Sequence, residues 1–226
     1  MKSVLVTGGT VRLGRAITER LRAEGWRVIT SSHRADAGAD LIADLSAPDG
    51  AVKLYAATLK ALGGTPPDAL VNNAALFTGD DASIAAVNLE SPKKLTMLMA
   101  GRETGVGAVV NILDAGARDS SCSRDSSRTY LDSKRALLDF TRSAAAMFAA
   151  TLRVNAVAPG PVLAPTDVHV KAGETLLDRR PTPDDVAAAV SYLLGAESTT
   201  GAIIPVDAGQ HLTCGRGVSP RQEIVA

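Results

Sequence analysis

Short apolar runs alternate with longer amphipathic segments along almost the whole chain. The apolar runs are rich in Val, Leu, Ile and Ala, which is typical of buried strands. They predict strands at residues 3–6, 26–31, 40–43, 69–72, 107–113, 152–158 and 202–206. The segments between them carry apolar residues at helical spacing, as at Leu13, Ile17 and Leu21. They predict helices at residues 13–24, 51–62, 84–100, 127–148 and 182–195.

Several of these helices have clear start and stop signals. Gly25 ends the first helix, and the glycine and proline pairs within residues 63–67 close the second. Thr182 is a good N-cap, Pro183 suits the first helical position, and acids at 184–185 complement the positive end of the helix dipole. These signals support helices between the strands.

Strands that alternate with helices of about ten or more residues require crossover connections, which make the strands parallel and cover both faces of the sheet. The pattern therefore predicts an α/β fold: a single-domain, doubly wound parallel sheet, Rossmann-like, with about seven strands. Residues 1–226 form one domain, with a loop at 115–128 and an irregular tail after about residue 211. Ligands of such sheets bind outside the carboxyl ends of the strands, so we expect the chemistry there.

Composition narrows the possible partners. With 226 residues and 46% hydrophobic content, the chain can bury one sizeable core. Its 24 basic and 24 acidic residues cancel, which argues against a nucleic acid or an anionic membrane as partner. Cys122 and Cys214 match no metal spacing and the three histidines form no cluster, so no metal site is expected. The sequence has no leader and no membrane-length apolar run, so we expect a cytoplasmic protein.

Residues 7–14 read Thr-Gly-Gly-Thr-Val-Arg-Leu-Gly and join the first predicted strand to the first predicted helix. Glycines at such a turn let the backbone approach phosphates, and the start of the helix favours negative charge. The turn therefore predicts a dinucleotide site that includes Gly8, Arg12 and Leu13. Arg12 is unusual because the common dinucleotide turn has glycine there. Its long cationic side chain reaches either the phosphates or whatever binds beside them.

The end of the second strand indicates which nucleotide is preferred. Ser32, His33 and Arg34 lie about twenty residues after the glycine turn, where an NAD site has Asp or Glu for the ribose 2′-hydroxyl. Hydroxyl, imidazole and guanidinium groups suit a 2′-phosphate instead, so the predicted cofactor is NADPH. The alternative is that Arg34 is a solvated loop residue. Asp44, after the third strand, either binds the adenine amine or caps the next helix.

Tyr130 and Lys134 are four residues apart on a predicted helix, so they share one face. A phenol with a pKa of about 10 is a poor acid or base at neutral pH. A nearby ammonium group favours the phenolate and brings the hydroxyl closer to the range for proton exchange with a carbonyl or imine. The alternative is that Tyr130 and Lys134 are a surface pair at helical spacing. The position of the pair after the fifth strand favours a catalytic role.

Further candidates lie where other strands end. Asp114 follows the fifth strand and either orients a substrate and relays a proton through the tyrosine, or caps backbone N–H groups of a loop. Asn72, Asn73 and Ala74 end the fourth strand; the asparagines either hold the turn or face the cofactor. Phe77 either packs in the core or, at the mouth of a cofactor cleft, stacks on a flat ring.

From Val4 to about Gly209 the chain resembles the short-chain dehydrogenase/reductase family. The matching residues are the glycine turn, Asp44-Leu45, Asn72-Asn73-Ala74, Asn88, Tyr130 with Lys134, Pro159-Gly160 and Val206-Asp207-Ala208-Gly209. The resemblance implies that Tyr130, Lys134 and Asp114 are catalytic. The implied cofactor-binding residues are Gly8, Arg12, Leu13, Ser32, His33, Arg34, Asp44, Leu45, Asn72, Ala74, Tyr130, Lys134, Pro159 and Gly160.

Within that family the details are most similar to pteridine reductases and dihydromonapterin reductases. Those enzymes have Arg at the position of Arg12, Asp at that of Asp114, and at that of Phe77 an aromatic residue that sandwiches a pterin against the nicotinamide. The resemblance implies hydride transfer from NADPH to a C=N or C=O bond of a small planar substrate, a dihydropterin as the best guess. Arg12, Phe77, Asp114 and Tyr130 are the implied substrate-binding residues, and the implied assembly is a homotetramer.

Three features depart from the family pattern. The sixteen positions from Asp114 to Tyr130 exceed the usual separation, Ala208 replaces a usual glycine, and residues 166–180 are short where relatives cover the substrate. The alternatives to a pterin reductase are a generic carbonyl or 3-oxoacyl reductase, and an NADP(H)-binding sensor or scaffold with little turnover. The intact pair of Tyr130 and Lys134 argues against the scaffold.

Overall fold

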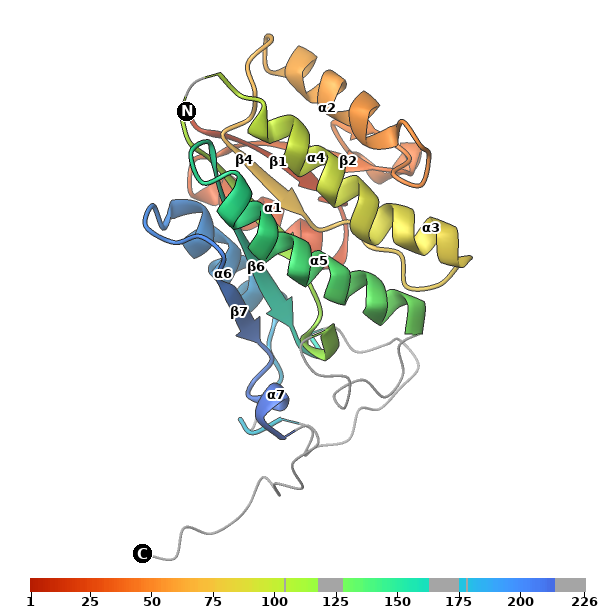
Figure 1. The fold of residues 1–226 in the computed structure, drawn as a ribbon, viewed down its shortest axis with the longest axis vertical. Coiled ribbons are helices and arrows are strands. Elements are labelled where there is room, and N and C mark those ends of the chain that lie inside the picture. The colour runs from red at the N-terminus through yellow and green to blue at the C-terminus, as the bar shows by residue number, and fades with distance from the viewer. Residues whose placement is uncertain (104, 118–127, 163–174, 178, 214–226) are drawn as a thin grey trace, which may run out of the picture.

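Seven parallel strands form one sheet in the order β3-β2-β1-β4-β5-β6-β7. The computed structural model describes residues 1–103, 105–117, 128–162, 175–177 and 179–213. The strands are β1 (Ser3–Thr7), β2 (Arg27–Ser32), β3 (Leu41–Ile42), β4 (Ala69–Asn72), β5 (Gly107–Ile112), β6 (Leu152–Pro159) and β7 (Ile203–Val206). The predicted parallel α/β arrangement is confirmed (Figure 1).

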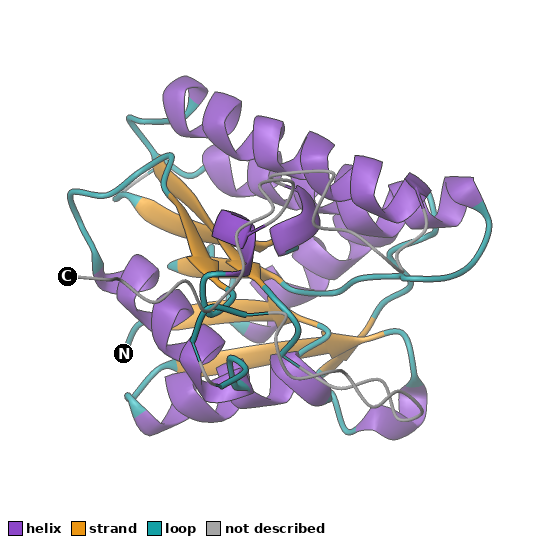
Figure 2. Ribbon diagram, turned by 90° about the horizontal axis from the view of Figure 1, so that it is seen from below, coloured by secondary structure: helices purple, strands orange, loops and turns teal. Residues whose placement is uncertain are grey.

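Helices cover both faces of this sheet (Figure 2). The α-helices are α1 (Arg12–Ala23), α2 (Gly50–Ala61), α3 (Asp81–Ala85), α4 (Ser91–Ala100), α5 (Arg128–Met147), α6 (Pro183–Gly195) and α7 (Gln210–Thr213). The remaining turns are the 3-10 turns η1 (Ala35–Ala37) and η3 (Ala115–Ala117) and the π-helical turn η2 (Ala86–Glu90). Among the described helices, none combines the length and apolar character needed to cross a bilayer.

The central strands are buried on both sides, which explains their unbroken apolar runs. All five residues of β1 are buried. Val4 and Val6 pack with residues of α1 and α6 on one face, whereas Leu5 packs with residues of α2, α4 and α5 on the other. A strand that faces two helical layers needs apolar side chains at every position, so it shows no alternation.

Three predicted segments differ from the structure. The helix predicted at 84–100 begins earlier, at Asp81, because Asp80 caps it by accepting the Ser83 N–H, and it contains η2. The predicted loop at 115–128 begins with η3, and the short helix α7 runs from Gln210 into the first residues of the predicted irregular tail. The residues Cys122, His169 and Cys214 lie outside the described part of the chain.

The strand register gathers distant segments at the carboxyl edge of the sheet. The last residue pairs along this edge are Thr7 with Ser31, Asn72 with Asn111, and Pro159 with Val206. The glycine turn, the segments that follow β4 and β5, and Pro159–Gly160 therefore lie at the same edge. This is the edge where the fold class predicts a ligand.

Candidate active site

A cavity of about 680 Å³ opens at the carboxyl edge of the sheet. Its walls come from the glycine turn, the segment after β4, the end of β5, the start of α5 and the segment after β6. Ten predicted site residues line it: Gly8, Arg12, Leu13, Ala74, Phe77, Asp114, Tyr130, Lys134, Pro159 and Gly160. The fold thus brings most of the predicted cofactor and substrate residues into one cavity.

The glycine turn is held tightly against the segment after β4. Gly8 has φ of +62°, and a β-carbon on Gly14 would lie only 2.0 Å from the Gly8 carbonyl oxygen. The Asn73 side-chain amide donates to the carbonyls of Thr7 and Gly8 at 2.9 and 3.1 Å. Asn73 therefore holds the turn, and the turn has room only for glycine at position 14.

The first turn of α1 has the chemistry of an anion site. Val11, at the N-cap, makes no side-chain cap hydrogen bond, and this turn contains no acidic residue. Backbone N–H groups at a helix start without a side-chain cap favour a negative ligand. Arg12 lies there with φ of +49°, a left-handed conformation that strains a residue with a β-carbon. The glycine turn, the helix start and Arg12 together fit a dinucleotide diphosphate.

Tyr130, Asp114 and Lys134 form a connected group on the other side of the cavity. The Tyr130 hydroxyl donates to Asp114 Oδ2 at 3.1 Å, and the Gly116 N–H donates to Asp114 Oδ1 at 2.8 Å. Lys134 Nζ donates to the Ile112 carbonyl at 2.9 Å and lies 5.8 Å from the centroid of the Tyr130 ring. Asp114 therefore contacts the tyrosine hydroxyl and also holds a loop, and a catalytic role for it stays a prediction.

Burial and this neighbourhood set the ionisation of the group. Burial and the adjacent Asp114 carboxylate raise the pKa of Tyr130. Burial lowers the pKa of Lys134 to about 8, with Asp114 opposing the shift. The lowered Tyr130 pKa expected from the Tyr130–Lys134 spacing is therefore wrong. The desolvated hydroxyl faces a carboxylate, and both effects penalise the phenolate.

A family comparison agrees with this arrangement. The model of the enoyl-(acyl carrier protein) reductase family matches residues 12–211, which include the glycine turn from Arg12 onward, Asp114, Tyr130 and Lys134. L-xylulose reductase from Bos taurus is 30% identical over 92% of this chain and 96% of its own. The chain belongs to the short-chain dehydrogenase/reductase family. The predicted enzyme class, an oxidoreductase, is confirmed.

Two further relatives of this oxidoreductase carry cofactor information. The crystal structure of FolM alternative dihydrofolate reductase 1 from Brucella canis, complexed with NADP, is 31% identical. It superposes with a TM-score of 0.82 over 100% of this chain and 98% of that chain. The NADP-dependent (R)-specific alcohol dehydrogenase of Lentilactobacillus kefiri is 28% identical over 92% of this chain and 96% of its own.

Phe77 of the oxidoreductase lies at the cavity and not in the core. Its side chain is 57% exposed, and its ring stacks on Tyr130 with centroids 4.8 Å apart and an interplanar angle of 28°. The core-packing interpretation is therefore wrong. An exposed aromatic ring beside a proton donor is available to a planar ligand.

A buried polar network that the sequence interpretation missed supports this aromatic pair. Asn88 in η2 accepts the Leu76 N–H at 2.8 Å and donates to the Leu76 carbonyl at 2.9 Å and to Ser133 Oγ at 3.2 Å. Ser133 Oγ donates to the Tyr130 carbonyl at 2.6 Å. Asn88 is one of the residues that match the family, whereas nothing in the sequence around Ser133 predicted a role for it. The segment that carries Phe77 is thereby tied to α5.

The residues predicted to bind the 2′-phosphate, Ser32, His33 and Arg34, follow the part of β2 that lies beside the glycine turn. None of the three lines the cavity. The Gly9 N–H donates to the carbonyl of Ser31 at 3.3 Å, which places the end of β2 next to the turn. Ser32 Oγ accepts the Arg34 N–H at 3.0 Å. The exposed Arg34 guanidinium pairs with Asp36 at 2.6 Å. Arg34 therefore lies just after the end of β2, and its guanidinium already forms an ion pair with an exposed carboxylate.

Three other predicted cofactor residues make structural contacts. Asp44 Oδ1 accepts from the backbone N–H and hydroxyl of Ser46 at 2.9 and 2.6 Å, which lowers the pKa of Asp44. Leu45 is buried in the core, and the buried Asn72 donates to Asn111 Oδ1 at 2.8 Å. Binding roles for these three stay predictions. Val11 and Gly14 of the glycine turn, and Asn73 and Ala75 after β4, also line the cavity. Sequence reasoning did not select the lining residues Ile112, Leu113, Pro161 and Val162.

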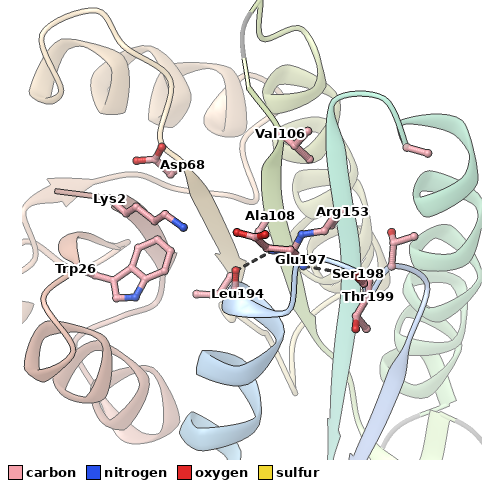
Figure 3. A pocket seen from close by; sticks show the side chains of 12 residues that line it. Lys2, Trp26, Asp68, Val106, Ala108, Arg153, Leu194, Glu197, Ser198 and Thr199 are labelled. Carbon is pink, nitrogen blue, oxygen red and sulfur yellow. Dashed lines mark hydrogen bonds between the residues drawn. The ribbon is translucent and has the colours of Figure 1, made fainter.

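A second cavity, of about 490 Å³, lies at the opposite, amino edge of the sheet (Figure 3). Two of its charged residues bond to backbone groups: Arg153 donates to carbonyls at the end of α6 and just after it, and Asp68 accepts from the N–H of Ser3 and also from its hydroxyl. Lys2 lies 6.0 Å from the Trp26 ring. Within the described residues, no group of three or more His, Cys, Asp or Glu is placed to hold a metal.

Proposed function

We propose that this protein is an NADPH-dependent reductase that reduces a C=N or C=O bond of a dihydropterin. The observation that carries the proposal is the stack of Phe77 on Tyr130, with the Tyr130 hydroxyl bonded to Asp114, in the 680 Å³ cavity. A planar ring has an aromatic wall there and a proton donor within the same cavity. The likeness to FolM alternative dihydrofolate reductase 1 with NADP supports both the cofactor and the substrate class.

The cofactor would lie across the carboxyl edge, with its diphosphate on the glycine turn and α1. Ser32, His33 and Arg34 would bind the 2′-phosphate, and Asp44 would lie on the adenine side. Pro159–Gly160, opposite the glycine turn, would line the nicotinamide end. The fit rests on the α1 start, which has no side-chain cap and no acidic residue in its first turn, and on the place of Gly8 and Arg12 in the cavity lining.

Bound NADPH supplies the hydride, and the residues of this chain govern the proton. The raised pKa of Tyr130 keeps its hydroxyl protonated at neutral pH, so it can donate to the heteroatom of the reduced bond. Asp114, held by the Gly116 N–H, orients that hydroxyl. The Lys134 ammonium, 5.8 Å from the ring, stabilises the phenolate that forms. Arg12, at the cavity wall, faces the substrate side.

The direct test is steady-state oxidation of NADPH with dihydrobiopterin and with a panel of ketones and quinones. The proposal expects the highest kcat/KM with the pterin. A protein that oxidises NADPH with ketones and leaves dihydrobiopterin unchanged would overturn the substrate class and keep the reductase.

Phe77→Ala tests the aromatic wall. The loss of about 1–3 kcal/mol of stacking and contact should raise the KM for dihydrobiopterin about five- to a hundredfold. Phe77→Leu, which keeps apolar volume without a ring face, should recover only part of the loss. Tyr192→Ala is the matched control, since Tyr192 is 60% exposed on α6, away from the cavity. An unchanged pterin KM in Phe77→Ala would contradict the stacking role.

A generic carbonyl reductase is the second candidate, favoured by the 28% identity to the NADP-dependent (R)-specific alcohol dehydrogenase. Tyr130 and Lys134 would serve it equally well. It predicts that Phe77→Ala changes ketone and pterin kinetics alike. A sensor or scaffold with little turnover is disfavoured by the intact Tyr130–Asp114–Lys134 group. The predicted homotetramer and cytoplasmic location stay expectations, and light scattering on purified protein tests the first.

A further inference from the structure

Asp207, directly after β7, has a buried carboxylate that organises the loop around it. Its Oδ1 accepts the Gly209 N–H at 3.1 Å. Its Oδ2 accepts the backbone N–H of His211 at 2.8 Å and contacts His211 Nδ1 at 2.7 Å. Asp207 is 2% exposed, so these bonds replace the water that the carboxylate would otherwise have. The pair of Asp207 and His211 therefore fixes the first turn of α7.

On one side this pair lies directly behind a wall of the active-site cavity. The Gly160 N–H donates to the Val206 carbonyl at 3.0 Å. A β-carbon on Gly160 would lie 2.7 Å from Asp207 Cβ. Asp207 is thus in close contact with the Pro159–Gly160 wall, although it does not itself line the cavity.

On the other side α7 contacts η3, the turn that directly follows Asp114. The N–H groups of Gly116 and Ala117 donate to the side chain and the carbonyl of Asp114 at 2.8 and 3.0 Å. Asp114 in turn accepts the hydroxyl of Tyr130. Figure 1 shows α7 just beyond the carboxyl end of β7. A continuous set of contacts therefore leads from His211 to the proton donor.

The same loop holds a third segment. Ala208 has φ of +52°, a strained conformation for a residue with a β-carbon, and its carbonyl accepts the N–H groups of Leu176 and Leu177 at 3.0 and 3.1 Å. The bonds of Asp207 to the residues that follow Ala208 keep this carbonyl in place. Segments that come from three parts of the chain thus depend on one buried carboxylate and its histidine.

We propose that Asp207 and His211 are positioning residues: they hold α7 so that η3 keeps Asp114 aligned with Tyr130. The proposal rests on the proposed reductase function only in that some reduction must be measured. Neither residue contacts the reacting atoms. Small displacements of such a group lower turnover about ten- to a hundredfold in other enzymes.

The test compares His211→Ala with His211→Asn, whose amide nitrogen stands close to the position of Nδ1 and keeps a donor for Asp207. In His211→Ala, kcat should fall at least about tenfold, while the Kd for NADPH, from fluorescence titration, changes less than about threefold. His211→Asn should restore most of kcat. Leu212→Ala is the matched control, because Leu212 is half exposed on the same short helix, and its kcat should be unchanged.

A second readout needs no substrate. Amide hydrogen exchange in residues 113–117 should be at least about tenfold faster in His211→Ala than in the unmodified protein and in His211→Asn. Unchanged exchange together with kcat within about twofold would overturn the proposal. Equal losses in His211→Ala and His211→Asn would also overturn it, since the donor to Asp207 would then not be what matters.

The two proposals fail in different ways. Kinetics are measured with dihydrobiopterin and with the best ketone of the panel. Inactivity toward the pterin alone overturns the substrate assignment, and the His211 comparison then proceeds on the ketone. If His211→Ala does not fold, Asp207→Asn, which keeps the side-chain volume, is measured in the same assays with the same expected losses of kcat and protection.

Discussion

The two edges of the sheet each have a cavity lined by charged residues, yet only one is arranged for chemistry. At the amino edge, the Arg153 guanidinium donates hydrogen bonds to four backbone carbonyls at the end of α6 and after it. At the carboxyl edge, Tyr130 bonds to Asp114, and Lys134 lies 5.8 Å from the Tyr130 ring. Asp114 and Lys134 each also make one bond to the backbone, and all three residues line the cavity. A cavity lined by charged residues therefore indicates a candidate site where those residues also contact one another, and not where they bond to the backbone alone.

The backbone conformations at the two edges differ in the same way. Gly25, Gly63 and Gly105, which turn the chain at the amino edge, have positive φ and open space around the missing β-carbon. Among the described residues, the two non-glycine positions with positive φ are Arg12 and Ala208, and both lie at the carboxyl edge. Strain of this kind costs about 1–3 kcal/mol per residue and persists where surrounding contacts enforce it.

The largest expected effect comes from Tyr130→Phe at the carboxyl edge. Phenylalanine keeps the stack with Phe77 and the burial, and removes only the hydroxyl that donates to Asp114. Turnover should fall about 10²–10⁴-fold while NADPH affinity and melting temperature change little. Steady-state kinetics and thermal melts check this, with Tyr192→Phe on α6 as the control. Near-normal turnover would show that another group supplies the proton.

Arg153→Met tests the role of the amino edge, where we expect an effect on stability and not on binding. The carbonyls of Leu193, Leu194 and Ala196 lose their donors, so the free energy of unfolding should fall by about 2–4 kcal/mol. The KM values for NADPH and substrate should stay within about twofold. Denaturant melts measure the stability, and Arg22→Met, an exposed arginine with one 3.7 Å ion pair, should change it by less than about 0.5 kcal/mol. A raised KM without loss of stability would make the amino edge a binding site.

The smallest expected effect concerns the residues after β2 that are predicted to bind the 2′-phosphate. Arg34→Ala should weaken NADPH about tenfold more than NADH, because a charge-assisted contact to the 2′-phosphate is lost. Asp36→Ala, which frees the Arg34 guanidinium from its surface partner, should leave the preference intact or strengthen it. Equal kcat/KM with the two cofactors in the unmodified protein would contradict the 2′-phosphate role.

The strands, the parallel sheet and the edge with the candidate site could all be predicted from the sequence. This was possible because the signals are local: unbroken apolar runs for strands buried on both faces, helices between them, and a glycine turn at the first crossover. The pairing of Tyr130 with Lys134 could also be predicted, because helical spacing alone places the two side chains on one face of a helix. Ser32, His33 and Arg34 after the second strand predicted NADPH, and the family resemblance then grouped Asp114 with Tyr130 and Lys134 as catalytic.

The interactions among the site residues could be found only in the folded structure. The exposure of Phe77 and its stack on Tyr130, the raised pKa of Tyr130, and the hold of Asn88 on Leu76 all depend on residues far apart in the chain. Asp207 and His211 are only four residues apart, but the burial of Asp207 and the contact of α7 with η3 come from the folded structure. Desolvation and hydrogen-bond partners are properties of the packed neighbourhood, and no local pattern of residue types encodes them.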